Sequence, residues 1–187
     1  NTKTGGRMAI HAMIDLETLA TDPHCTVLTV GGVKFNPNND NEPYDEFYYK
    51  LDIDEQDALG RTVTDSTIEW WGKQDPKVKE EAFGDNGDRV SMEAMLTALS
   101  KWLVGADTIW GWGYGFDLTI IEDMYRSKGI PIPYNFWQVK DARTFISILP
   151  SDPRKTMQQD LHNALADSYY QAKAIQIAHQ KLLCVQQ

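Results

Sequence analysis

Two carboxylates stand two residues apart in the segment Ile14-Asp15-Leu16-Glu17-Thr18. If this segment closes a β-strand, Asp15 and Glu17 point to the same face of a sheet, because side chains alternate along a strand. Adjacent carboxylates repel each other unless a cation lies between them, and hard oxygen ligands suit Mg²⁺ or Mn²⁺. An isolated pair is more often solvated. Asp52 and Asp54 have the same spacing on a predicted third strand, and we interpret them as surface residues.

Three more residues with possible chemistry follow in the chain. Asp117 comes after a glycine-rich turn, where a helix is predicted to begin, and its alternative role is a helix cap. His162 precedes Asp167 by five residues, with Asn163 placed to cap the last helix. Alone, His162 fits a surface loop, and Asp167 fits a favourable charge near a helix N-terminus. The joint occurrence of all five residues in this order favours a shared site.

The elements that must position these residues are read from periodicity and turn residues. A period of two predicts three strands, and a loop dense in turn residues joins the second strand to the third. Helical spacing then predicts four helices, the first capped by Asp65 or Ser66, with two short strands among them. The strands are 8–18, 26–35, 46–53, 108–113 and 136–141, the loop is 36–43, and the helices begin at 65 or span 91–104, 118–127 and 164–183.

This order, three strands and then helices alternating with single strands, predicts an α/β protein. It is typical of the ribonuclease-H-like fold, with a mixed five-stranded sheet flanked by helices. We expect residues 8–187 to form one domain, and residues 1–7 to be a tag remnant or a disordered end before a natural start at Met8.

On these five residues the chain resembles the DEDDh family of 3′→5′ exonucleases, which includes proofreading subunits, ribonuclease T and oligoribonuclease. That family carries DxE on the first strand, an aspartate after the fourth strand and HxxxxD near the C-terminal helix. Three segments further resemble the phage and prophage exonuclease A and exonuclease VIII-like branch, which also has mycobacterial exoribonuclease relatives. They are IDLETL, STIEWW (66–71) and WGWGYGFD (110–117).

The resemblance implies a metal-dependent hydrolysis of phosphodiester bonds with two Mg²⁺ or Mn²⁺ ions. It assigns Asp15, Glu17 and Asp167 to the ion on the side of the nucleophile, with Asp15 bridging to the second ion. It assigns Asp117 to the second ion, mainly through coordinated water. It makes His162 the general base.

The implied substrate is the 3′ end of a single-stranded nucleic acid, and the implied product is a nucleoside monophosphate. The resemblance places the backbone of Thr18 and Leu19 at the terminal 3′-hydroxyl, and Tyr114 in the same cleft. The phage-like segments favour DNA over RNA. A 3′→5′ exoribonuclease and a catalytically inactive nucleic-acid-binding member of the fold are the alternatives.

Composition narrows the class of protein. The net charge of -9 argues against a surface that coats long nucleic acids, although an enzyme can hold a short strand end through metal ions. Cys25 and Cys184 form no CxxC pair, and neither a signal peptide nor a membrane span is visible. We therefore expect no membrane partner and a reducing bacterial cytoplasm, with a phage genome as a possible source. The sequence leaves the oligomeric state open.

Other aromatic and basic residues have weaker assignments. Trp102 and Trp110 lie inside apolar elements and are predicted to pack in the core. Trp70 and Trp71 end a helix that would flank the cleft, where one of them could touch a base. Three basic residues could meet phosphates, although solvated surface charge is the favoured interpretation. They are Arg143, Arg154 and Lys155.

Overall fold

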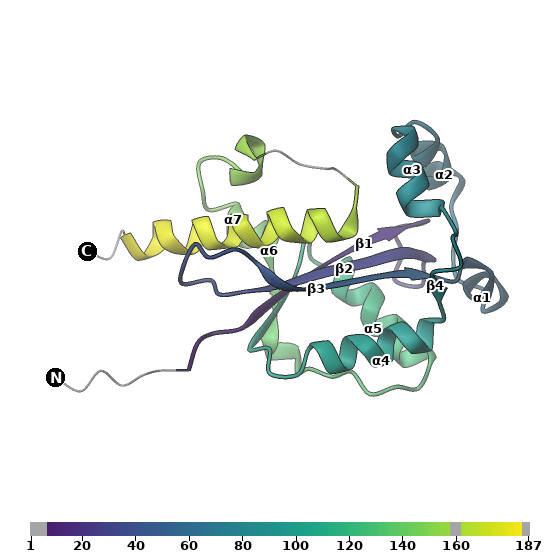
Figure 1. Cartoon of the computed structure of the whole chain (residues 1–187), viewed down its shortest axis with the longest axis horizontal. Helices are drawn as coiled ribbons and strands as arrows, with labels where there is room; N and C mark the ends of the chain where they lie inside the picture. Colours follow the sequence, from purple (N-terminus) through teal and green to yellow (C-terminus); the bar gives the residue numbers. More distant parts are fainter. Residues whose placement is uncertain (1–6, 158–161, 185–187) are drawn as a thin grey trace.

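The computed structural model describes residues 7–157 and 162–184 (Figure 1). The prediction for residues 1–7 therefore lies almost wholly outside the described residues. Six strands form one mixed sheet in the order β4-β3-β2-β1-β5-β6, so β1 lies near its centre. The strands are β1 (His11–Thr18), β2 (Val27–Phe35), β3 (Tyr44–Leu51), β4 (Arg89–Val90), β5 (Thr108–Gly111) and β6 (Val139–Asp141).

The first three strands pair antiparallel, whereas β5 pairs parallel with both β1 and β6. This confirms the predicted α/β class and mixed sheet. The sheet has one strand more than predicted, because β4 is only two residues long and shows no period of its own.

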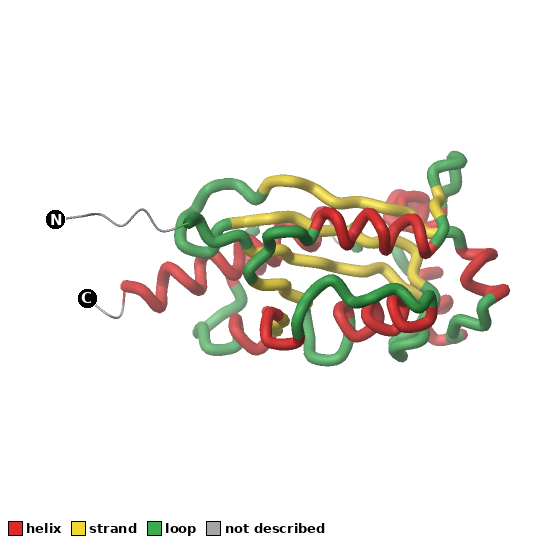
Figure 2. Tube along the Cα trace, turned by 90° about the horizontal axis from the view of Figure 1, so that it is seen from below, coloured by secondary structure: helices red, strands yellow, loops and turns green. Residues whose placement is uncertain are grey.

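Helices cover both faces of the sheet. In Figure 1, α7 runs along one face, with α6 beside it, and α4 and α5 run along the other, which Figure 2 shows from that side. The two short helices α2 and α3 stand over the carboxyl-terminal end of β1. The helices are α1 (Ile53–Ala58), α2 (Asp65–Gly72), α3 (Pro76–Phe83), α4 (Met92–Trp102), α5 (Asp117–Ser127), α6 (Ala142–Ile146) and α7 (Ala164–Cys184), with 3₁₀ turns at η1 (Phe136–Gln138) and η2 (Pro153–Thr156).

Apolar side chains fill both layers. On the α4 and α5 face, Ile14 and Val30 pack with Leu96 and its neighbours, and on the other face Met13 packs with Ile175 of α7. Because Ile14 and Met13 are consecutive, β1 alternates between the two layers as a fully covered strand must.

Gly31 brings the start of α7 down onto the sheet. A Cβ at this position would lie 2.2 Å from the backbone carbon of Ala164, so a larger residue here would push α7 away. Gly31 also pairs with Asp15 across the β1–β2 ladder. The first turn of α7 is thereby held beside the carboxylates of β1.

Several predicted boundaries are confirmed by their caps. Ser91 caps α4 by accepting a hydrogen bond from the Ala94 amide at 3.1 Å, and Asn163 accepts one from the Ala166 amide at 2.9 Å. The α2 cap is Thr64, which makes no side-chain capping bond, so the choice of Asp65 or Ser66 was wrong by one or two residues.

The predicted strand bounds differ from the observed ones. The first strand begins at His11 and not at 8, the second begins at Val27 and not at 26, and the fourth ends at Gly111 and not at 113. The third strand ends at Leu51, because Asp52 accepts a hydrogen bond from the Glu55 amide at 3.0 Å and starts α1 instead. The first half of the predicted strand 136–141 is the turn η1, in which Asn135 and Gln138 form a capping box. No helix among the described residues is long and apolar enough to cross a membrane.

Candidate active site

Asp15 and Glu17 lie at the carboxyl-terminal end of β1, on the face that α7 covers. Asp15 Oδ1 accepts a hydrogen bond from Gln171 Nε2 of α7 at 2.9 Å, and Glu17 lies beside Asp167 in the first turn of α7. Both carboxylates are buried, at 9% and 8% exposure. The predicted alternation along the strand is confirmed.

Asp117 joins these residues from the start of α5. Its two carboxylate oxygens accept hydrogen bonds from backbone amides. Oδ1 accepts from Leu16 in β1 at 3.2 Å, and Oδ2 accepts from Trp112, which follows β5, at 2.9 Å. Phe116, and not Asp117, occupies the cap position of the helix. The carboxylate therefore links β1 to the end of β5.

His162 and Asp167 reach the same place from the entrance to α7. The His162 amide donates to Asp167 Oδ2 at 3.1 Å, and His162 has a φ of 64°, in the left-handed region. Possible ligand atoms of Glu17, His162 and Asp167 all lie within 4.8 Å of one another. The structure thus brings together all five residues singled out from the sequence.

The electrostatics of the cluster are those of crowded, buried carboxylates. Burial, followed by the charges of Asp117, Glu17 and Asp167, raises the pKa of Asp15 well above its usual value, although the hydrogen bond from Gln171 opposes the rise. Burial and the neighbouring carboxylates raise the pKa of Glu17 to about 8. Burial raises the pKa of Asp117 to about 7 and that of Asp167 to about 6, against the hydrogen bonds that each accepts.

The chemistry of this donor set fits a hard divalent cation. Four carboxylates converge where their negative charges are unfavourable, and a cation among them would remove that penalty. Gln171 Oε1 is also buried with no hydrogen-bond partner in the described part of the chain. Oxygen ligands with at most one imidazole are those of a Mg²⁺ or Mn²⁺ site, not of a thiolate-rich zinc site.

Gln171 was missed in the sequence. It lies four residues after Asp167 in α7, so both side chains share one face of the helix. That spacing was a usable signal, because a polar residue one turn beyond a ligand is well placed to orient the site.

Thr18 and Leu19 contact α2 and the residue that precedes it through their backbone carbonyls. Their carbonyl oxygens accept hydrogen bonds from Trp71 Nε1 at 2.9 Å and from the Thr64 amide at 3.0 Å, respectively. Trp71 is buried, whereas Trp70 is 38% exposed and stands edge-on against the His162 ring, with 4.7 Å between ring centroids. Of the two tryptophans, only Trp70 can therefore present a ring surface to a ligand.

Tyr114 lies in the turn that leads from β5 to α5, three residues before Asp117, and is 96% exposed. Trp110 is buried as predicted. Trp102 is only partly buried against the core and donates from Nε1 to the Asp45 carbonyl at 2.8 Å.

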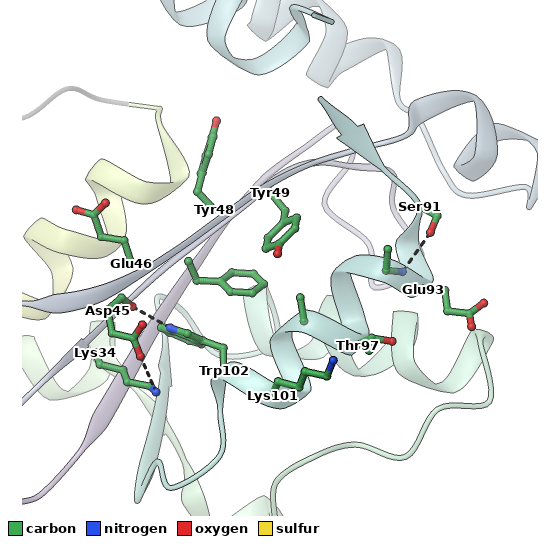
Figure 3. Close-up of a pocket in the computed structure, with 13 residues that line it drawn as sticks. Lys34, Asp45, Glu46, Tyr48, Tyr49, Ser91, Glu93, Thr97, Lys101 and Trp102 are labelled. Atoms are coloured by element: carbon green, nitrogen blue, oxygen red, sulfur yellow. Dashed lines mark hydrogen bonds and ion pairs between the residues drawn. The ribbon is translucent and has the colours of Figure 1, made fainter. Parts of the chain in front are cut away.

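A large groove lies elsewhere, between β3 and α4, with a volume of about 1060 Å³. Figure 3 shows Tyr49 and Trp102 on its walls, with Lys34 paired to Asp45 at one end. None of the five clustered residues lines it. Its size therefore does not mark the chemical site.

Comparison with known proteins adds a family to this geometry. A protein-family model described as the 3′-5′ exoribonuclease Rv2179c-like domain matches residues 10–179. Among curated proteins, an exodeoxyribonuclease of Enterobacteria phage T4 is 29% identical over 162 residues, which cover 73% of this chain and 70% of that one.

Two solved structures illustrate the shared fold. E. coli exonuclease I in complex with a 5cy-dT13 oligonucleotide matches with a TM-score of 0.61 and 13% identity, over 96% of this chain and 42% of that one. The nuclease domain of 3′hExo, a DEDDh family member, bound to rAMP, matches with a TM-score of 0.60 and 16% identity, over 93% of each chain. The chain thus spans less than half the length of the exonuclease I chain.

Proposed function

Since the chain belongs to the 3′-5′ exoribonuclease Rv2179c-like domain family, and with it to the 3′-5′ exonucleases of the DEDDh type, we propose that it releases nucleoside monophosphates from the 3′ end of single-stranded nucleic acid. The observation that carries the proposal is the convergence of four buried carboxylates and His162 at the end of β1. The intact set also argues against an inactive binding module, since such a module would need none of these side chains.

Two Mg²⁺ or Mn²⁺ ions are part of the proposal. Asp15, Glu17 and Asp167 would hold one ion, and Asp117 would hold the second together with Asp15. When bound, such ions polarise the phosphate, activate a water and stabilise the leaving oxygen. Gln171 orients Asp15 by its hydrogen bond, and backbone amides orient Asp117.

His162 is the proposed general base. Burial lowers the pKa of His162, so its ring is neutral near pH 7 and a ring nitrogen can accept the proton of the attacking water. The hydrogen bond from its amide to Asp167 joins the base to a metal ligand, which keeps the proton acceptor beside the reacting phosphate. Thr18 and Leu19 are proposed to border the terminal 3′-hydroxyl, and Tyr114 to border the strand.

DNA is the proposed preferred substrate. The phage T4 relative is an exodeoxyribonuclease, and this agrees with the phage-like segments of the sequence. On the same likeness we propose the bacterial cytoplasm as the site of action. RNA is the second candidate, because the family description names an exoribonuclease.

Matched DNA and RNA oligonucleotides of one sequence, labelled at the 5′ end, test both parts of the proposal. We expect a ladder that shortens by one nucleotide at a time, faster on DNA, and no shortening when the 3′ end is blocked. Faster digestion of RNA would overturn the sugar preference alone. Cleavage of the blocked strand would overturn the exonuclease assignment.

A further inference from the structure

Arg143, the second residue of α6, lies against the glycine-rich turn that carries Asp117. A Cβ placed on Gly113 would meet Arg143 Cζ at 3.5 Å and Nη2 at 3.6 Å, so the guanidinium covers the open side of this glycine. Gly113 also has a φ of 110°, which side-chain-bearing residues rarely adopt. The absence of a side chain at residue 113 therefore leaves room for the guanidinium of Arg143.

The turn and α6 are fastened to each other at this point. Asp141 Oδ1 accepts hydrogen bonds from the Gly113 amide at 2.8 Å and from the Arg143 amide at 3.1 Å. These two hydrogen bonds fix the backbone of Arg143 relative to the turn.

Arg143 lies near the end of the carboxylate cluster that Asp117 forms. The guanidinium lies at Gly113, four residues before Asp117, and its charge opposes the rise in the pKa of Asp117 that burial causes. Arg143 therefore borders the cluster on the side of Asp117 and lies outside its centre.

Within the described ranges, the guanidinium of Arg143 forms no ion pair and donates no hydrogen bond, and the residue is exposed. Arg154 differs, since it pairs with Asp152 at 2.8 Å and stacks on the Trp112 ring at 3.5 Å. Arg126 also differs, since it pairs with Glu122 at 2.7 Å. In a chain of net charge -9, Arg143 is thus an available cation at the rim of the cluster.

We propose that Arg143 binds the first phosphate on the 5′ side of the scissile one. The inference rests on the proposed function. A strand with a free 3′-hydroxyl carries one phosphate on its terminal nucleotide, the scissile phosphate, which belongs among the metal ligands. Any second phosphate must lie toward the 5′ end, and guanidinium binds phosphate through paired, charge-assisted hydrogen bonds.

The surface beyond the turn can accept the strand that leaves this site. A cleft of about 340 Å³ lies beside Gly113. Tyr114, Phe136 and Lys140 line it, together with the carboxylates Glu122 and Asp141. Phe136 is 84% exposed, and Lys140 is exposed as well. Aromatic rings beside a cation suit single-stranded nucleic acid, because bases stack on the rings while a phosphate meets the charge. The strand therefore crosses the glycine-rich turn over Arg143.

Two dinucleotides separate this phosphate from the scissile one. The dinucleotide dTdT holds only the scissile phosphate, whereas the same dinucleotide with a 5′-phosphate holds the next one as well. Kinetics with both substrates should be measured for the native protein, Arg143→Ala, Arg143→Lys and Arg126→Ala. Arg126→Ala is the matched control, because it removes the same charge from an exposed position on α5.

For the native protein we expect the 5′-phosphate to raise kcat/KM on the order of 10- to 100-fold, mainly through KM. Arg143→Ala should lose this gain, so that its kcat/KM is about equal on the two dinucleotides, Arg143→Lys should retain part of it, and Arg126→Ala should retain it all. Equal losses of Arg143→Ala on both substrates would overturn the proposal, and so would an unchanged gain.

Calorimetric titration with the two dinucleotides separates this proposal from the proposed function. If the native protein hydrolyses neither dinucleotide, the ladder on the longer oligonucleotide still decides the exonuclease assignment, and the binding constants still decide the role of Arg143. Tighter binding of the phosphorylated dinucleotide by the native protein but not by Arg143→Ala would support the phosphate site. Equal affinities in both proteins would refute it.

Discussion

Two pairs of acidic residues share the same spacing in this chain and have different surroundings. Asp15 and Glu17 end a central strand and are covered by α7, whereas Asp52 and Asp54 begin the short helix α1. Asp52 is partly buried and caps that helix, and Asp54 is exposed to solvent.

The difference between the pairs lies in what surrounds the charge. Solvent and backbone amides satisfy the second pair, so it needs no further ligand. The first pair is buried beside Asp117 and Asp167, and these like charges raise its pKa values. The spacing of the carboxylates is the same in both pairs and does not distinguish them. Burial among other carboxylates is what marks a cation site.

The largest expected effect comes from exchanging one carboxylate of each pair for its amide. Asp15→Asn should lower kcat on a single-stranded oligonucleotide by at least about 10⁴-fold, because the ligand that we propose both ions share is lost. Asp54→Asn should stay within about twofold of the native rate, as an exposed substitution does. Comparable losses in both variants would remove the distinction between the pairs.

A smaller loss is expected on replacing His162, the proposed general base beside the buried pair. His162→Ala should lower turnover by about 10²–10⁴-fold, the usual contribution of general base catalysis. Its affinity for Mg²⁺ should survive, because carboxylates supply the oxygen ligands. Turnover close to native at saturating metal and substrate would contradict the assigned role.

The smallest effect concerns stability without metal. Because the folded state raises the pKa of Glu17 to about 8, it binds this proton more tightly than the unfolded state does. Folding stability from this group therefore falls as pH rises from about 4.5 to about 8. Glu17→Gln should melt higher than the native protein at pH 8, by roughly 2–4 °C for each kcal/mol relieved, and the gap should close at pH 5.

Thermal melts in excess chelator measure this gap, and Asp54→Asn serves as the control. Its melting temperature should follow that of the native protein across the same pH range. A gap for Glu17→Gln that stays constant with pH would show that the charge of Glu17 is not the cause.

The sequence predicted the elements with long periodic patterns and the residues with fixed spacing. β1, β2 and α4 follow from their apolar periods, and α7 follows from Asn163 and the pattern after it. Short elements such as β4 and α6 were not predicted, because two and five residues are too few to show a period. Their existence depends on contacts between distant segments.

The site was predictable to the extent that its residues fit one pattern. The five core residues were found, but the separate roles of Trp70 and Trp71 depend on which way α2 turns its faces, and the sequence does not fix this. Arg143 was interpreted as solvated charge for a similar reason. Its relation to Gly113 arises only when β5 and β6 lie side by side.

Metal dependence tests the central claim most directly. The native protein, treated with excess EDTA, should leave a 5′-labelled single-stranded oligonucleotide intact, and Mg²⁺ or Mn²⁺ added back in excess should restore a ladder of single-nucleotide steps from the 3′ end. The same ladder formed in excess EDTA would contradict the account, because the buried carboxylates would then have no cation to hold.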